Sequence, residues 1–309
     1  FSPRQLLGHG LAVEALRSLI EEAKSEGHWD DVTRASLVYV ALALDKIRDY
    51  NSRMTRWHVN REVLVNTFDR HDFAFKWSFA EFDAAHSAIP WCVEQVSSTM
   101  EGTAKLLISE ATLLTEEDRV RVAITAGSAT TLDEAANSVD AIITDPPYYD
   151  NVMYAECSDY FYVWLKRSLR DTWPELCTLP LTDKEAEAVA NPSLYATVAS
   201  PRRGRKVPGE KSAADLADEH YERLLTQSFR EAHRVLRDAG VMTVMFTHKR
   251  VDAWDTLGQA LLEAGFSINS SWPVHTEAEH SLHQAKKNAA SSTIFLTCRK
   301  RGDTKPAYW

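Results

Sequence analysis

The chain has 309 residues, 44% of them hydrophobic and 26% charged, which suffices for one large domain or two of ordinary size. Its formal net charge is −9, which argues against a protein that holds nucleic acid by bulk positive charge alone. An enzyme with this balance that acts on DNA must concentrate its basic residues on one face.

Two absences narrow the setting of the protein. No apolar run reaches the ~20 residues that a membrane-spanning helix needs, and no signal peptide is recognisable. The four cysteines are scattered without a CxxC pair, which predicts neither a zinc ribbon nor a disulfide framework, and we expect no metal site. We therefore expect a cytoplasmic protein that does not associate with a membrane.

Residues 1–115 read as a mostly helical segment, which we interpret as an insertion or recognition region. Thr33 or Asp31 can cap a helix that ends near residues 51–52, and its apolar residues recur at helical spacing. These residues are Leu37, Val40, Ala41, Leu44 and Ile47. The stretch 53–92 is dense in aromatic residues, which favours core packing, with a base-stacking surface as the alternative.

From about residue 118 the pattern changes to alternating strands and helices. The expected strands are 119–125, 139–144, 241–246, 266–272 and 292–298, and the expected helices are 132–137, 153–169, 218–237 and 253–265. Residues 171–215 read as a polar, irregular connection. This alternation predicts an α/β fold over residues 116–309, with a mainly parallel sheet that is covered on both faces and has 139–144 as a central strand.

The end of the 139–144 strand carries the most specific chemistry. Two successive prolines hold φ near about −65° and remove two backbone donors, so Asp145-Pro146-Pro147-Tyr148 forms a stiff, extended loop. The Asp145 carboxylate and the Pro146 carbonyl can then accept both N–H bonds of an exocyclic amino group on a planar base, and Tyr148 offers a ring for stacking. We therefore expect Asp145, Pro146, Pro147 and Tyr148 to be the catalytic residues.

This motif resembles the catalytic motif of the S-adenosylmethionine-dependent amino-methyltransferases, which methylate adenine N6 or cytosine N4. The stretch DPPYYDNVMYAECSDYFYVWLKRSL at 145–169 extends the likeness, together with FSPRQLL at 1–7, DYNSRMTRW at 49–57 and SSTIFLTCRKR at 291–301. Taken together, these segments resemble the large prokaryotic adenine-specific DNA methylases that carry a zinc ribbon. The likeness implies a Rossmann-like methyltransferase sheet over residues 116–309 as the catalytic core.

The resemblance also implies S-adenosylmethionine as cofactor, with Gly127, Ser128, Ala129 and Asp145 on its adenine side. Gly127 permits close approach, whereas Ser128 stands where the family commonly has Asp, which weakens the expected contact. The glycine-rich loop that holds the methionine end of the cofactor has no match, because Gly8-His9-Gly10 follows no strand. In the family this loop precedes the FSPRQ block, so the resemblance implies a chain that lacks its N-terminal cofactor-loop region.

Three further features complete the expected site. The basic residues Arg202, Arg203, Arg205 and Lys206 are the densest positive cluster, and phosphate contact competes with a solvated loop as their interpretation. His248 follows a strand and reads as a satisfied structural residue more readily than as a functional one. Tyr149, Asp150 and Asn151 shape the rim of the pocket.

These features predict a DNA methyltransferase that acts on the N6 amino group of a flipped adenine, in restriction-modification or phage defence. Two alternatives remain open: an N4-cytosine or RNA methyltransferase, and a non-catalytic DNA-binding subunit of a defence complex. The expected partners are DNA and other subunits of a restriction or defence complex.

Overall fold

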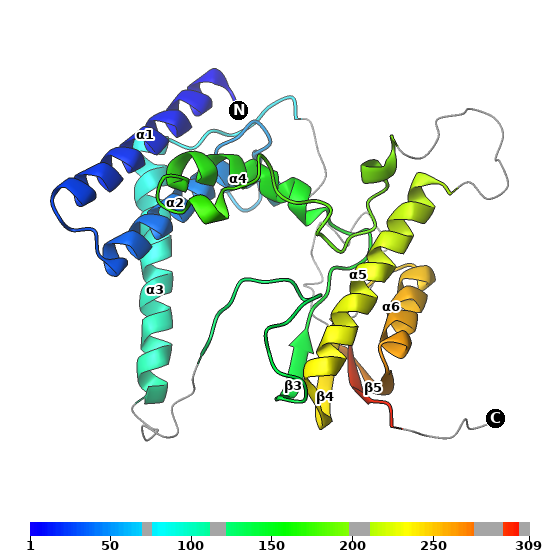
Figure 1. Ribbon diagram of the computed structural model, residues 1–309. Helices are drawn as coiled ribbons and strands as arrows, with labels where there is room; N and C mark the ends of the chain where they lie inside the picture. Colours follow the sequence, from blue (N-terminus) through cyan, green and yellow to red (C-terminus); the bar gives the residue numbers. More distant parts are fainter. Residues whose placement is uncertain (70–75, 112–121, 198–210, 275–292, 303–309) are drawn as a thin grey trace. The chain divides into compact units, whose positions relative to one another are not determined.

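A computed structural model describes residues 1–69, 76–111, 122–197, 211–274 and 293–302, which form two compact units (Figure 1). Unit 1 comprises Phe1–Ala123 and Tyr154–Lys184, and unit 2 comprises Ile124–Met153 and Glu185–Trp309. The segment Tyr154–Lys184 therefore clusters with unit 1, although the sequence assigned it to the catalytic core.

Unit 1 is mostly helical, as the periodicity of its first part predicted. Its elements are α1 (Pro3–Ser25), α2 (Asp31–Tyr50), β1 (Arg56–His58), β2 (Val63–Val65), η1 (Thr67–Asp69), the π-helical turn η2 (Ala84–Ala88), α3 (Ile89–Ala111), α4 (Tyr154–Leu169) and η3 (Pro174–Leu176). The cap of α2 is Asp30 rather than Thr33 or Asp31, because the Asp30 carboxylate accepts the Thr33 N–H at 2.7 Å. Helix α4 confirms the helix expected at 153–169.

The apolar residues expected at helical spacing in α2 form the centre of the unit 1 core. Leu37, Ala41, Leu44 and Ile47 are buried there, and Val40 packs against them. Leu16 and Ile20 of α1 and Cys92 of α3 complete the contact. The core therefore forms where the apolar stripes of three helices meet.

A buried polar cluster joins α1 to the end of α2. The His9 ring nitrogen Nε2 lies 3.0 Å from the carbonyl oxygen of Asn51, and burial lowers the pKa of His9 to about 4. Asp45 and Arg48 form a buried ion pair, and burial raises the pKa of Asp45 to about 6. The Arg48 guanidinium also lies 4.8 Å from the ring centroid of Trp164 in α4. These contacts fix α1, α2 and α4 to one another.

Unit 2 holds the sheet and the helices that cover it. Its elements are β3 (Val139–Thr144), η4 (Pro192–Tyr195), α5 (Ala213–Val235), β4 (Leu236–Phe246), α6 (Val251–Glu263), β5 (Phe266–Val274) and β6 (Thr293–Lys300). The described strands follow the order β3-β4-β6-β5. The α/β class is therefore confirmed.

The expectation of a mainly parallel sheet with a central 139–144 strand is wrong. Among the described strands β3 lies at the edge, and it pairs in parallel with β4 alone. The β4–β6 and β5–β6 pairs are antiparallel, so β3, β4 and β5 share one direction and β6 opposes them. The sheet is mixed because β5 and β6 are consecutive strands that pair directly, without a crossover.

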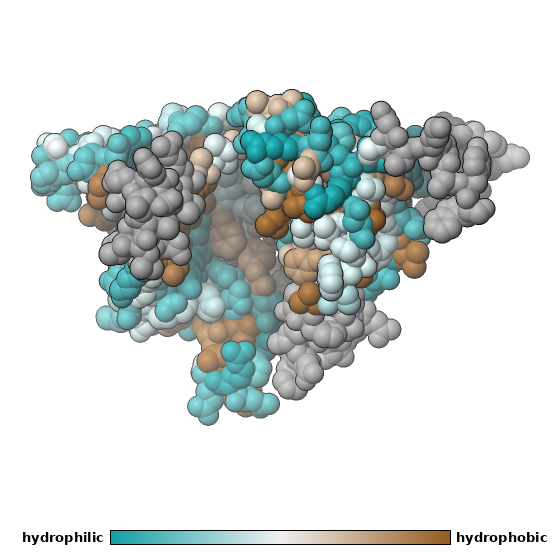
Figure 2. Space-filling view, turned by 90° about the horizontal axis from the view of Figure 1, so that it is seen from below, coloured by the Kyte–Doolittle hydropathy of each residue, from teal (hydrophilic) through white to brown (hydrophobic). Residues whose placement is uncertain are grey.

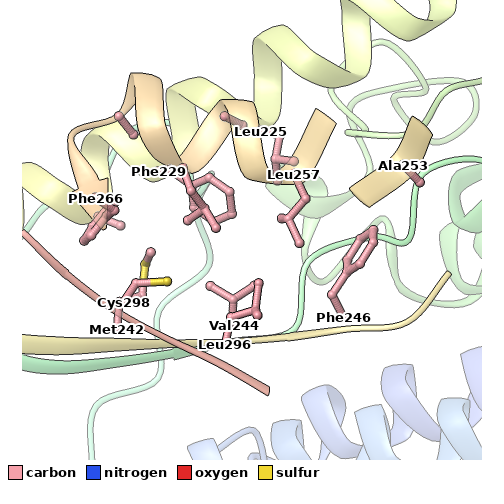
Figure 3. Packing of buried hydrophobic residues seen from close by; sticks show 14 of the residues in the cluster. Leu225, Phe229, Met242, Val244, Phe246, Ala253, Leu257, Phe266, Leu296 and Cys298 are labelled. Atoms are coloured by element: carbon pink, nitrogen blue, oxygen red, sulfur yellow. The ribbon is translucent and has the colours of Figure 1, made fainter. Parts of the chain in front are cut away.

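One face of the sheet carries the core of unit 2. Helices α5 and α6 lie side by side on this face, and their apolar residues point into the strands (Figure 3). The central contacts come from Leu225 and Phe229 of α5, Leu257 of α6, Met242 and Val244 of β4, and Leu296 of β6. On the other face, Ile143 and Trp272 are 84% and 63% exposed, so no described helix of unit 2 covers them, contrary to expectation.

The boundaries of α5 and β4 differ from those expected, for local reasons. Helix α5 begins five residues before Asp218 because Ser212 and Asp215 form a capping box. β4 begins at Leu236, and its regular pairing with β3 resumes at Val241 after an irregular stretch. A Cβ on Gly240 would lie 2.7 Å from the Leu236 side chain, so this position requires glycine.

The surface is mainly hydrophilic, with separate apolar patches (Figure 2). A search of the described helices for one of sufficient length and hydrophobicity to span a bilayer found none.

Truncation of Leu257 tests the core of unit 2. Leu257 is fully buried, so we expect Leu257→Ala to lower the free energy of unfolding by about 2–5 kcal/mol. Leu262 lies on the same helix but is 49% exposed, and Leu262→Ala should change it by less than about 0.5 kcal/mol. Urea denaturation measures both, and equal effects would contradict the assigned face of α6.

The buried state of His9 predicts a pH dependence. With a pKa of about 4 when folded against 6.5 in the unfolded chain, only the unfolded state holds the proton between these values, so His9 adds stability as the pH rises through this range. The wild type should therefore gain stability relative to His9→Gln between about pH 4 and 6.5. Asp45 acts in the opposite direction but is present in both proteins, so it cancels in the difference. A difference that stays constant with pH in urea titrations would contradict burial of a neutral His9.

Candidate functional site

The loop after β3 and the loop after β4 meet at one edge of the sheet. Thr144 pairs in parallel with Val244, so both strands end on the same side, where open α/β sheets bind ligands. The ring centroids of Tyr149, after β3, and His248, after β4, lie 5.7 Å apart. The expectation that the Asp145–Tyr148 loop lies beside Thr247-His248 is therefore confirmed.

Asp145 is the exposed polar group of this loop. Its carboxylate makes no hydrogen bond or ion pair with any described residue, and the same holds for the carbonyl oxygen of Pro146. Pro146 is buried, and Pro147 is half-buried. Both acceptors named from the sequence are thus available for a ligand.

The Pro147 carbonyl, by contrast, belongs to the scaffold. The Tyr221 hydroxyl of α5 donates to it at 2.8 Å, and the Tyr149 N–H donates at 3.0 Å. Tyr148 is half-buried, and its ring meets that of Phe246 edge-on at 5.4 Å. Because Phe246 is fully buried, Tyr148 anchors the loop to the core through this contact.

Tyr149 has a backbone conformation that is rare for its residue type. Its φ is +56°, in the left-handed region, and its side chain is almost completely buried. The hydroxyl donates to Asp218 Oδ1 at 2.5 Å, and the carbonyl accepts the Ala190 N–H at 3.0 Å. Burial and the bond to Asp218 raise the pKa of Tyr149, so the hydroxyl stays protonated. These bonds offset a backbone strain of about 1–3 kcal/mol.

Asp150 joins the two loops electrostatically. His248 Nε2 donates to its Oδ1 at 3.1 Å, and Arg250 Nη1 donates to its Oδ2 at 3.1 Å. The Arg250 backbone N–H donates to His248 Nδ1 at 3.2 Å, which places the proton of the neutral ring on Nε2. Both His248 nitrogens are therefore used within the scaffold, which agrees with the structural interpretation of this residue.

The Arg250 guanidinium also stacks over the Tyr149 ring, 5.2 Å from its centroid. Sequence reasoning missed Arg250, Asp218, Tyr221 and Ala190. The position of Arg250, two residues after His248, was the one usable signal. The two α5 residues, Asp218 and Tyr221, follow ordinary helical spacing and carry no local signature.

The residues expected to bind the cofactor lie in an exposed segment. Residues 122–125 do not form the expected strand, of which 119–121 lie outside the described residues, and 132–137 form turns rather than a helix. Ser128 makes local contacts only: its hydroxyl lies 2.8 Å from that of Thr130, and its carbonyl accepts the Thr131 N–H. A Cβ on Gly127 would meet open space, so no close approach requires glycine there. The expected DNA-binding residues Arg202, Arg203, Arg205 and Lys206 lie outside the described residues.

An apolar groove of about 560 Å³ lies in unit 1, between α2 and α3. Val32, Tyr39, Val93, Val96 and Met100 are among the residues that line it. The sequence did not predict this groove, and its lining lacks converging polar groups. The DPPY loop therefore remains the candidate site on chemical grounds.

No model of a protein family matches this chain, and no curated protein matches it. The function must therefore be argued from the chemistry of the site.

The Tyr149 hydroxyl provides a test of how the loop is held. Tyr149→Phe removes the bond to the Asp218 carboxylate, and we expect the free energy of unfolding to fall by about 1.5–3 kcal/mol, as for hydrogen bonds to charged groups. Asp218→Asn keeps an acceptor oxygen and should cost less. Urea denaturation of both variants checks the order. A Tyr149→Phe variant as stable as the wild type would show that this bond does not hold the loop.

Proposed function

We propose that this protein takes part in methylation of the N6 amino group of adenine in DNA, with S-adenosylmethionine as methyl donor. One observation carries the proposal: a rigid Asp-Pro-Pro-Tyr loop at the carboxyl end of a parallel strand leaves its carboxylate exposed and without a partner among the described residues. The direction of the four strands is compatible with a methyltransferase-type sheet.

The chemistry assigned to this chain is orientation of the amino group. If Asp145 and the Pro146 carbonyl each accept one N–H bond of that group, they fix its plane and direct the nitrogen lone pair away from the loop. The scaffold bonds of Pro147 and Tyr149 keep both acceptors in place without using them. A base within a duplex cannot reach this loop, so the target must be flipped, at a cost of a few kcal/mol.

The described residues do not form a complete site for the methyl donor. Gly127, Ser128 and Ala129 are exposed, and no recorded contact joins them to Asp145. We therefore assign no step through the donor to them, and restrict the roles proposed here to the target base.

The wider setting of the proposal follows from the same residues. All four cysteines are free, which suits a protein of the reducing cytoplasm. DNA is the proposed partner, together with other subunits of a restriction or defence complex.

Substitution of Asp145 tests the proposal directly. In nucleosides from DNA incubated with the full-length protein and S-adenosylmethionine, we expect N6-methyladenine, and a decrease on the order of 100-fold or more in Asp145→Ala. Mass spectrometry of the digested nucleic acid measures this. The fold should be retained, because the exposed carboxylate leaves no cavity when it is removed.

Asp140→Ala is the matched control, since Asp140 is an exposed carboxylate on the same strand that pairs with Arg237. It should leave methyl transfer unchanged. Methylated cytosine or methylated RNA in place of N6-methyladenine would support the second class of methyltransferase. Unchanged turnover in Asp145→Ala would exclude Asp145 as the acceptor of the amino group.

A further inference from the structure

Trp57 projects from a small hairpin in unit 1. Strands β1 and β2 pair antiparallel, with Trp57 opposite Leu64, and Trp57 is 55% exposed. A large indole left in water forgoes a substantial part of the stabilisation that burial gives. The aromatic stretch 53–92 thus includes a side chain that the core does not use, in contrast to Trp91 and Phe82, which pack against the core of unit 1.

The tip of the hairpin is fixed by its own backbone. The Arg61 N–H donates to the His58 carbonyl at 3.2 Å and closes a turn, and Glu62 follows with a left-handed φ of +50°. Trp57 is therefore held at the end of an ordered turn rather than on a floppy loop.

The base of the hairpin is tied to the end of α2. Arg56 donates through Nε and Nη2 to Asp69 Oδ2, at 2.9 and 2.7 Å. Asp49, in the last turn of α2, accepts the Phe68 N–H at 3.2 Å and the side-chain amide of Asn66 at 2.9 Å. The hairpin is thus a preorganised element, which lowers the entropic cost of binding through its exposed side chains.

The charge around Trp57 is opposite to that of the chain. Residues 53–65 contain three arginines against one glutamate, a net charge of +2 in a chain of −9. Asp69 compensates Arg56, whereas Arg53 and Arg61 are exposed and form no ion pair with any described residue. The Arg53 guanidinium lies 5.8 Å from the Phe79 ring centroid. An exposed indole between free guanidinium groups fits a nucleobase flanked by phosphates.

We propose that the β1–β2 hairpin binds DNA, with Trp57 stacked on an unstacked base and Arg53 and Arg61 contacting the adjacent phosphates. This contact lies in unit 1 and is separate from the Asp145 loop. It uses the alternative that the sequence left open for the aromatic stretch, and it does not depend on methyl transfer.

Titration of the full chain with a single-stranded oligodeoxythymidine tests the hairpin without a methyl donor. We expect quenching of intrinsic tryptophan fluorescence, and in Trp57→Ala a loss of part of this quenching with binding weakened about 10-fold or more. Trp57→Phe should recover most of the affinity, because it keeps a ring for stacking. Arg53→Gln with Arg61→Gln should lower the slope of log K against log salt concentration by about 0.7 for each contact.

Trp272→Ala is the matched control, since Trp272 is 63% exposed but lies on β5 of unit 2. It should bind like the wild type. Equal loss of binding in Trp57→Ala and Trp272→Ala, or none in Trp57→Ala, would overturn the proposal, as would tight binding of a matched RNA but not of DNA. Failure of methyl transfer alone would leave it intact, because the readout is binding.

Discussion

The parallel pairing of β3 with β4 is the constraint on which the candidate site depends. It sets the register that turns Met242 and Val244 toward α5 and α6, and a slip of one residue would turn this apolar set away from the core. The same register brings both strand ends to one edge. Asp150 can therefore bind His248 and Arg250, although these residues lie about a hundred positions along the chain. Core packing and site geometry are thus consequences of a single pairing.

The hydrogen bonds of the loop separate its groups into two kinds. The Pro147 carbonyl, the Tyr149 hydroxyl and the Asp150 carboxylate are used by the scaffold, through Tyr221, Asp218 and the residues after β4. Asp145 and the Pro146 carbonyl are not used by any described residue. A buried loop whose polar groups are nearly all paired has reason to leave one exposed acceptor pair free only if something outside the chain binds it.

The sequence predicted the elements whose signals are local. The apolar spacing of α2, the β-branched run of β3 and the turn at Gly265, which has a φ of +91°, each appear where their residues indicated. It could not predict that β3 lies at an edge or that β6 inserts beside β4, because strand order depends on long-range pairing. Likewise, Asp218 and Tyr221 have the spacing of any amphipathic helix, and their contact with the loop follows only from the packing of α5 on the sheet.

The acidic charge of the chain does not oppose contact with DNA, because charge acts locally. Around the Asp145 loop, Asp150 is compensated by Arg250, and in the hairpin Asp69 is compensated by Arg56. Paired carboxylates contribute little long-range field at physiological ionic strength, where screening acts within about 8 Å. What a phosphate meets at the hairpin is then the unpaired Arg53 and Arg61, and the net charge of −9 says little about that encounter.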